Sequence, residues 1–176
     1  MNKKMRNLLY MFIMAGGLVV ILAALNRLPS SIQKGFARQY DSVEEAKRSL
    51  GFENMLVPRY FPEGISWPPS FIFGQKEPYK AVVLEFREAK TGETVLSVIQ
   101  TSRRGSEAQL QRSRLSDLKE DIPYRLKGRI ALLQVGTCDK GVPCSRISWQ
   151  EGDLYFTVLY MSSPFELIRI AESMIK

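Results

Sequence analysis

Residues 145–175 read SRISWQEGDLYFTVLYMSSPFELIRIAESMI, and the spacing of the apolar side chains changes within this stretch. Before the turn residues Glu151-Gly152-Asp153, Ile147 and Trp149 lie on one face, and after the turn Tyr155, Thr157 and Leu159 alternate with Phe156, Val158 and Tyr160. This alternation predicts a β-hairpin that pairs residues 145–150 with residues 154–161.

A helix is predicted directly after this hairpin. Ser163 is its expected cap, Pro164 occupies its first position, and Glu166 completes a capping box. Apolar residues then recur at helical spacing, and we expect the buried face to consist of Leu167, Ile168, Ala171, Met174 and Ile175. A hairpin followed by an amphipathic helix predicts a sheet that is covered by a helix.

Two further elements lie toward the N-terminus. Residues 80–88 and 93–102 alternate around Ala89-Lys90-Thr91-Gly92, which predicts another hairpin. Ser42 and Glu45 form a capping box, and Gly51 ends the helix that they begin. The order of helix, antiparallel strands and helix predicts an α+β domain, in which helices pack on one face of a curved antiparallel sheet.

Three segments have a less regular pattern. Residues 65–74 contain Pro68 and Pro69, so we expect an edge strand or an irregular extended segment. Residues 103–121 are polar and charged, and predict a mobile insertion with a short helix near residues 116–120. This insertion is either a solvated surface or a basic surface that docks on an acidic partner or lipid. Residues 124–135 predict one further strand region.

The N-terminal segment predicts the cellular location. Leu8–Leu25 reads LLYMFIMAGGLVVILAAL without a charge, after Lys3, Lys4 and Arg6. As a helix this run spans about 27 Å, close to the hydrocarbon core of about 30 Å. Basic residues before such a span stay in the cytoplasm. We therefore expect a single-pass protein of the bacterial cytoplasmic membrane: a cytoplasmic tail (1–7), a transmembrane anchor in contact with lipid (8–25), a linker (26–40) and an extracytoplasmic domain (41–176).

Other interpretations of this apolar run were weighed. A cleaved signal peptide needs a pair of small residues at its cleavage site, and pairs such as Leu22 and Ala24 fit poorly. A lipoprotein needs a cysteine where Leu25 stands. A buried core helix would show a one-sided apolar stripe, whereas this run is apolar all round.

The charge balance argues against a nucleic-acid partner. The chain has 25 basic and 18 acidic residues. Six of the basic residues precede residue 40, whereas all acidic residues follow it, so the exported part is nearly neutral. A nearly neutral mixed surface lacks the electrostatic signature of phosphate-backbone binding.

The reactive side chains predict a binding protein rather than an enzyme. Cys138 and Cys144 lie close together in an exported chain, which favours a disulfide. A redox-active pair would have CxxC spacing, and a zinc site would need more ligands. The chain has no histidine and no glycine-rich phosphate loop. We expect no catalytic residue, no metal and no cofactor.

Several segments resemble a family of bacterial extracytoplasmic domains of unknown function, found at the C-terminal ends of membrane-anchored anti-sigma factors and related envelope proteins. The resemblance covers nearly all of residues 43–174, and its segments are VEEAKRSLGF, LVPRYFPEG, LSVIQ, ISWQEGDLYFTVLY and PFELIRIAESM. It implies a sheet-and-helix architecture akin to lipoprotein-carrier folds, without catalytic residues. Only six residues precede Asn7, so we expect no cytoplasmic sigma-binding domain, and the resemblance implies no regulatory role.

Two functions remain open at this stage. The first is a membrane-anchored interaction or sensor module that binds an envelope or membrane protein. The second is a carrier or chaperone that holds an apolar ligand inside the curved sheet. For the first, the candidate binding residues are Tyr60, Phe61, Trp67 and Phe71, with Arg103 and Arg104. The alternative for the aromatic residues is that they close one end of the core.

Overall fold

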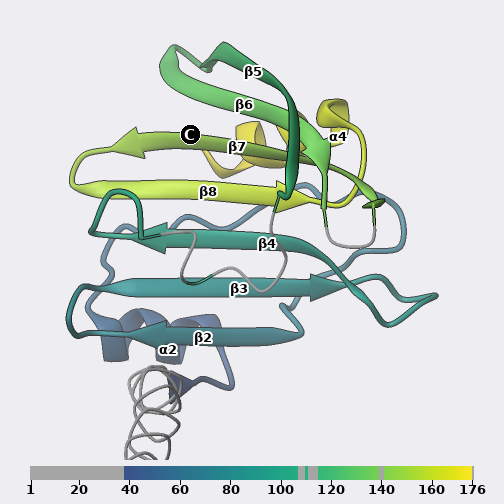
Figure 1. The fold of residues 1–176 in the computed structure, drawn as a ribbon. Helices are drawn as coiled ribbons and strands as arrows, with labels where there is room; N and C mark the ends of the chain where they lie inside the picture. Colours follow the sequence, from purple (N-terminus) through teal and green to yellow (C-terminus); the bar gives the residue numbers. More distant parts are fainter. Residues whose placement is uncertain (1–37, 107–109, 111–114, 139–140, 176) are drawn as a thin grey trace, which may run out of the picture. The chain divides into compact units, whose positions relative to one another are not determined.

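Eight antiparallel strands and two helices form the part of the chain that the computed structural model describes, residues 38–106, 110, 115–138 and 141–175 (Figure 1). The predicted sheet-dominated α+β fold is confirmed. The elements are β1 (Arg38–Gln39), α2 (Val43–Leu50), β2 (Phe71–Gln75), β3 (Ala81–Arg87), β4 (Thr94–Thr101), β5 (Asp117–Leu126), β6 (Arg129–Thr137), β7 (Pro143–Glu151), β8 (Leu154–Tyr160) and α4 (Pro164–Met174).

The predicted tail, anchor and most of the linker, residues 1–37, lie outside the described residues. Among the described residues, no helix has both the length and the apolar character needed to cross a bilayer. β1 lies within the segment predicted as linker, so the folded unit begins at Arg38.

The strands form one sheet in the order β1-β2-β3-β4-β8-β7-β6-β5. Both predicted hairpins, β3–β4 and β7–β8, are confirmed. The chain joins the sheet at Arg38, which pairs with Gly74 near the end of β2. We call this end of the sheet the proximal end; the loop 76–80 and the turns 127–128 and 152–153 also lie there. The opposite, distal end holds the turns 88–93 and 138–142 and the start of α4.

Both helices cover the same face of the sheet, as predicted. Val43, Ala46 and Leu50 of α2 share one hydrophobic core with Leu167, Ile170 and Ala171 of α4 and with alternate residues of the strands between them. The alternate residues of β3 in this core are Val82, Leu84 and Phe86, which are almost completely buried. Burial on this scale is the main stabilising contribution to such a fold.

The caps explain where each helix begins and ends. The Ser42 hydroxyl accepts a hydrogen bond of 3.1 Å from the Glu45 amide, and Gly51 takes a left-handed conformation with φ 65° after the last turn of α2. This confirms the cap and the end predicted for α2. Ser163 and Pro164 begin α4 as predicted, but the Ser163 side chain makes no capping hydrogen bond. The capping box predicted for α4 is therefore wrong, because the Glu166 carboxylate bonds to Tyr60 and Arg169 instead.

The buried face of α4 differs slightly from the prediction. Ile170 is fully buried, and Ile168, which was expected in its place, is only partly buried. This buried face packs mainly against β7 and β8.

Two predictions for residues 103–135 are wrong. The short helix expected near residues 116–120 is the start of strand β5, and the single strand expected at 124–135 is a hairpin of β5 and β6. A bulge between Leu118 and Glu120 breaks the alternation of β5, which hid the strand period. Lys127 and Gly128 turn the hairpin with positive φ angles of 47° and 84°. The rest of the predicted insertion, residues 107–109 and 111–114, lies outside the described residues.

The segment with two prolines divides into two parts. Residues 65–70 form no strand, with a cis peptide bond before Pro68, whereas residues 71–75 form β2 between β1 and β3. Leu50 and Tyr40 pack over Gly74 and leave no room for a side chain at this position. An added Cβ would lie 2.5 Å from Leu50 Cδ1. The outer edge of β5 carries Pro123, a bulge and charged side chains, which are features that oppose pairing with another strand.

Candidate functional site

Exposed apolar side chains gather at the distal end of the sheet. The large hydrophobic residues that are exposed in the described part of the chain are Trp67, Leu118, Ile122, Ile130, Leu132, Val142 and Phe165. Four of them, Trp67, Leu118, Val142 and Phe165, lie at or beside the distal turns and strand ends, with Leu118 on the face of the sheet that the helices leave uncovered and Phe165 on α4 over the covered face. We call these four residues the distal apolar surface.

Trp67 packs against a buried aromatic residue although it is 44% exposed. Its ring centroid lies 6.5 Å from that of Phe86, and the Phe61 ring lies 5.2 Å from Phe86 on the core side. Phe86 itself is fully buried at the distal end of β3. The structure therefore brings Phe61 and Trp67 together around one core residue, with Trp67 facing solvent in part.

Tyr60 is occupied by contacts with α4. Its hydroxyl donates a hydrogen bond of 2.6 Å to Glu166, and the Arg169 guanidinium lies 4.1 Å from the centroid of its ring. The hydrogen bond to Glu166 is the main cause that raises the pKa of the Tyr60 phenol. These contacts fix the turn 58–64 against the helix.

Ser173 fixes the same turn from its backbone side. Its hydroxyl accepts hydrogen bonds from the Arg59 and Tyr60 amides, at 3.0 and 3.1 Å, and donates one of 2.6 Å to the Ile170 carbonyl. The turn predicted as part of the binding site is thus anchored to α4 through Arg59 and Tyr60. Tyr60 positions this end of the molecule rather than standing free in solvent.

Phe71 lies at the distal end but on the other face of the sheet. Its ring stacks on Phe73 at 5.9 Å, and the Arg87 guanidinium lies 4.5 Å from its centroid. The helices cover the opposite face, where Ile72 and Gly74 point. Phe71 is therefore not part of the group formed by Phe61, Trp67 and Phe86.

Arg103 and Arg104 lie at the proximal end, away from the aromatic group. They follow β4, whose last residue, Thr101, pairs with Ala81 at the start of β3. Arg103 lies over the Tyr79 ring, 5.6 Å from its centroid. Trp67 contacts Phe86 near the other end of β3, and five residues of a strand span about 17 Å. One compact site cannot hold both the aromatic residues and these two arginines.

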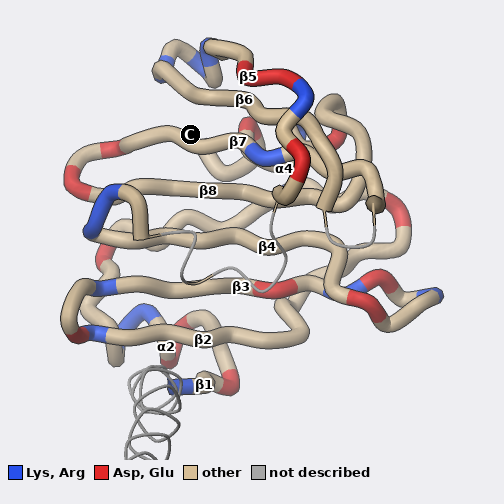
Figure 2. Tube along the Cα trace, in the orientation of Figure 1, with Lys and Arg blue, Asp and Glu red and all other residues tan. Residues whose placement is uncertain are grey.

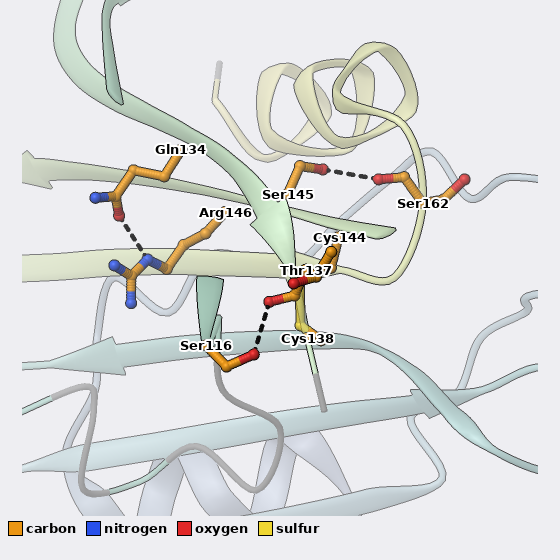
Figure 3. Close-up of a disulfide and its surroundings, with 8 residues drawn as sticks. All are labelled: Ser116, Gln134, Thr137, Cys138, Cys144, Ser145, Arg146 and Ser162. Atoms are coloured by element: carbon orange, nitrogen blue, oxygen red, sulfur yellow. Dashed lines mark hydrogen bonds between the residues drawn. A yellow bond between two sulfur atoms is a disulfide. The ribbon is translucent and has the colours of Figure 1, made fainter. Parts of the chain in front are cut away.

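The disulfide predicted between Cys138 and Cys144 is confirmed (Figure 3). Both cysteines are almost completely buried, beside Leu159. The Cys138 amide donates a hydrogen bond of 2.8 Å to the Val142 carbonyl inside the loop that the bridge closes, whose two cysteines are six positions apart in the sequence. The bridge therefore holds the β6–β7 turn and the exposed Val142 in place at the distal end.

Hydrogen bonds around the disulfide connect it to neighbouring strands (Figure 3). The Ser116 hydroxyl donates to the Thr137 carbonyl at 3.1 Å, and the Ser145 hydroxyl donates to the Ser162 carbonyl at 3.1 Å. Ser145 and Ser162 link β7 to the residues before α4. The disulfide loop and the start of α4, which carries Phe165, thus belong to one hydrogen-bonded framework.

The described residues offer little chemistry for a cofactor. They contain no group of three or more histidine, cysteine, aspartate or glutamate residues placed to hold a metal ion. A small hollow lies beside Glu85, Ser97 and Leu159. The volume in which the centre of a water molecule fits is about 10 Å³, which is room for about one water. The arrangement supports surface contact more readily than enclosure of a ligand.

Sequence reasoning missed three members of the distal apolar surface: Leu118, Val142 and Phe165. Phe165 had a usable signal, because it stands outside the apolar stripe of its helix and so could not be buried with Leu167 and Ile170. Leu118 was hidden by the bulge of β5 and Val142 by its position in the cysteine loop. No family model, no curated protein and no solved structure matches this chain.

Proposed function

We propose that the protein is a non-catalytic binding or sensor module of the bacterial envelope. Residues 8–25 anchor it in the cytoplasmic membrane, and the folded domain lies outside the cytoplasm, where it binds an envelope or membrane protein. The observation that carries this proposal is the distal apolar surface, which leaves four large hydrophobic side chains exposed beside a well-packed core.

The chemistry of this surface fits a protein partner. Aromatic residues that are held rigid before binding lose little conformational entropy when the partner covers them. Trp67 fits this description because its ring packs on Phe86, which is buried and packs in turn on Phe61. Phe165 is 77% exposed on the first turn of α4. Its apolar ring is exposed to water, which is unfavourable, and it does not pack in the core. Such an exposed ring favours a role in contact with another molecule.

The position of the surface fits an anchored protein. The chain joins the sheet at the proximal end, so the distal end is the part of the domain farthest along the strands from that junction. A partner in the envelope can therefore approach it. The disulfide supports an oxidising compartment, since such bridges persist mainly outside the cytoplasm.

The carrier alternative has weaker support. A pocket for an apolar ligand usually has a volume of about 300–1,000 Å³. The aromatic core residues of the described chain contact one another instead: Trp149 stacks on Phe156, with ring centroids 5.2 Å apart. Such pairs fill the space that a ligand would need.

Site-specific photo-crosslinking in intact cells tests the proposal. A photoreactive residue replaces Phe165 in the full-length membrane-bound chain, and the matched control carries it at Asp153, an exposed turn residue of the proximal end. We expect crosslinks to a defined envelope or membrane protein from position 165 and none to that protein from position 153.

Two results would contradict the proposal. Crosslinks that form equally at both positions would show that the distal end has no preference for a partner. A lipid or other small hydrophobic adduct recovered from the core, with no protein adduct at position 165, would favour the carrier. The variants Trp67→Ala and Phe165→Ala, each in the full chain, should reduce recovery of the partner while the folded domain persists.

A further inference from the structure

We propose that the proximal end of the domain docks on anionic headgroups of the same membrane that holds residues 8–25. The inference rests on the proposed membrane anchoring and adds a second, reversible contact between the folded domain and the bilayer. Three observations support it. They are the excess of basic residues at this end, an exposed isoleucine that lies beside them, and the point at which the chain joins the sheet.

Basic side chains predominate at the proximal end (Figure 2). They belong to the loops and turns that the strand register places there, and all are exposed: Lys76, Lys80, Arg103, Arg104, Arg125 and Lys127. The acidic residues of the same loops are Glu77, Glu151 and Asp153, and exposed Glu53 lies beside them, two residues after Gly51, whose carbonyl accepts a hydrogen bond from Lys80. Glu151 is already paired with Arg129 at 2.7 Å, which leaves the basic residues in clear excess.

The distal end has no such excess. Its turns and strand ends mix Arg87 and Lys90 with Glu63, Glu88 and Glu93. An anionic surface therefore attracts one end of the sheet and not the other. The charge asymmetry is a property of the fold, because the nearly neutral composition of residues 41–176 does not reveal it.

Ile130 adds an apolar contact to the basic end. It is 84% exposed, the highest value among the exposed large hydrophobic residues. It pairs with Arg125 on β5 and lies two residues from Gly128 in the turn, so basic side chains surround it. An apolar side chain among lysines and arginines fits the boundary between headgroups and acyl chains.

The N-terminal chain restricts where the domain can be. Residues 26–37 separate the expected anchor from Arg38, and a chain of this length extends at most about 40 Å. Arg38 stands at the proximal end, so the shortest path from the bilayer leads to the basic loops. The surface that the basic loops would contact is therefore the anionic lipid bilayer itself.

The expected attraction is moderate. Each basic residue close to an anionic bilayer changes the docking equilibrium about fivefold. The effect weakens beyond about 10 Å at ordinary salt, because mobile ions screen it. Docking should thus be reversible and sensitive to salt.

Fluorescence of the full-length protein in lipid vesicles tests the inference. Ile130→Cys carries an environment-sensitive dye, and Cys138 and Cys144 do not react because they form a buried disulfide. Lys90→Cys, in the distal β3–β4 turn, is the matched control. Vesicles contain phosphatidylcholine alone or with phosphatidylglycerol. We expect a blue shift at position 130 only with phosphatidylglycerol, reversed by high salt, and no shift at position 90.

Charge reversal separates specific docking from net charge. Arg103→Glu with Arg104→Glu should lower the docked fraction more than about tenfold, since each residue contributes about fivefold. Arg87→Glu with Lys90→Glu changes the net charge equally at the distal end and should leave docking intact. Equal effects of the two pairs would overturn the inference.

The anchor and the docking contact fail in different ways. If carbonate washes the protein from the vesicles, the proposed anchoring is wrong. If the protein remains inserted and the dye at position 130 stays in water on anionic vesicles, docking alone is wrong. A dye that becomes shielded only after soluble envelope proteins are added would assign the basic end to an acidic protein, and would also overturn the inference.

Discussion

Replacement of Gln100 by leucine should destabilise the fold, because it removes the hydrogen bonds that hold the backbone of Leu56 against β4. Gln100 is fully buried on the helix-covered face of β4. Its amide accepts a hydrogen bond of 2.9 Å from the Leu56 N–H and donates one of 2.6 Å to the Leu56 carbonyl. A single side chain thus satisfies both backbone groups of Leu56.

The size of the effect follows from these two bonds. A backbone group that loses its only partner in a poorly solvated place costs about 1–3 kcal/mol. Leu56 is only partly buried, so water replaces some of the lost bonding. We expect Gln100→Leu to lower the free energy of unfolding by about 2–4 kcal/mol. Gln150→Leu is the control, because Gln150 is exposed and donates one bond to the Gly152 carbonyl; its effect should stay within about 0.5 kcal/mol.

Urea unfolding of the full-length chain in detergent measures the difference. The midpoint should fall for Gln100→Leu while the slope with denaturant stays constant, which indicates a change of stability rather than of the unfolded state. Amide exchange at Leu56 should accelerate in the same variant. The reasoning is refuted if Gln100→Leu matches the wild type in stability and the Leu56 amide remains protected.

Three further predictions concern the disulfide, the packing and the pH dependence. Joint replacement of Cys138 and Cys144 by alanine should cost about 2 kcal/mol, as expected for a short loop; thermal unfolding checks this, and free thiols in the native protein would contradict the bridge. Gly74→Ala should destabilise by about 1–3 kcal/mol by overpacking, because Leu50 occupies the space of the new methyl group; an unchanged melting temperature would show that α2 shifts freely. Tyr60 has a raised pKa through its bond to Glu166, so its contribution is complete below the ordinary pKa of about 10 and is lost as pH rises through the folded value. The stability gap between wild type and Tyr60→Phe should therefore narrow above that pH in unfolding titrations, whereas a constant gap would contradict the assignment.

Local signals predicted those parts of the fold that depend on neighbouring residues. The cap of Ser42, the glycine end at Gly51 and the two hairpins follow from side chains within a few positions of each other. The disulfide was predictable because its two cysteines lie close together in the sequence and the N-terminal segment led us to expect an exported chain. Strand β5 was missed because its bulge interrupts the alternation on which strand prediction depends.

The candidate site depended on contacts that no local pattern contains. Tyr60 bonds to Glu166, 106 positions away, so its role in fixing the turn could not be inferred from either segment. The candidate site predicted from the sequence also grouped Arg103 and Arg104 with the aromatic residues. This happened because the sequence does not reveal which residues of β3 and β4 lie opposite each other. Once β4 is aligned with β3, these arginines lie at the proximal end. The two groups then belong to separate surfaces.

Strand β1 determines how the folded domain responds to mechanical force. It pairs with β2 through only two residues, Arg38 with Gly74 and Gln39 with Phe73. Tension transmitted through the N-terminal chain would run along this strand and load both pairs, together with the Arg38–Glu45 ion pair at 3.2 Å, in shear. The load would next reach Tyr40, which is buried and donates its N–H to the Ile72 carbonyl at 2.9 Å. We therefore expect this short strand to detach first under tension, while the other seven strands keep the distal apolar surface folded.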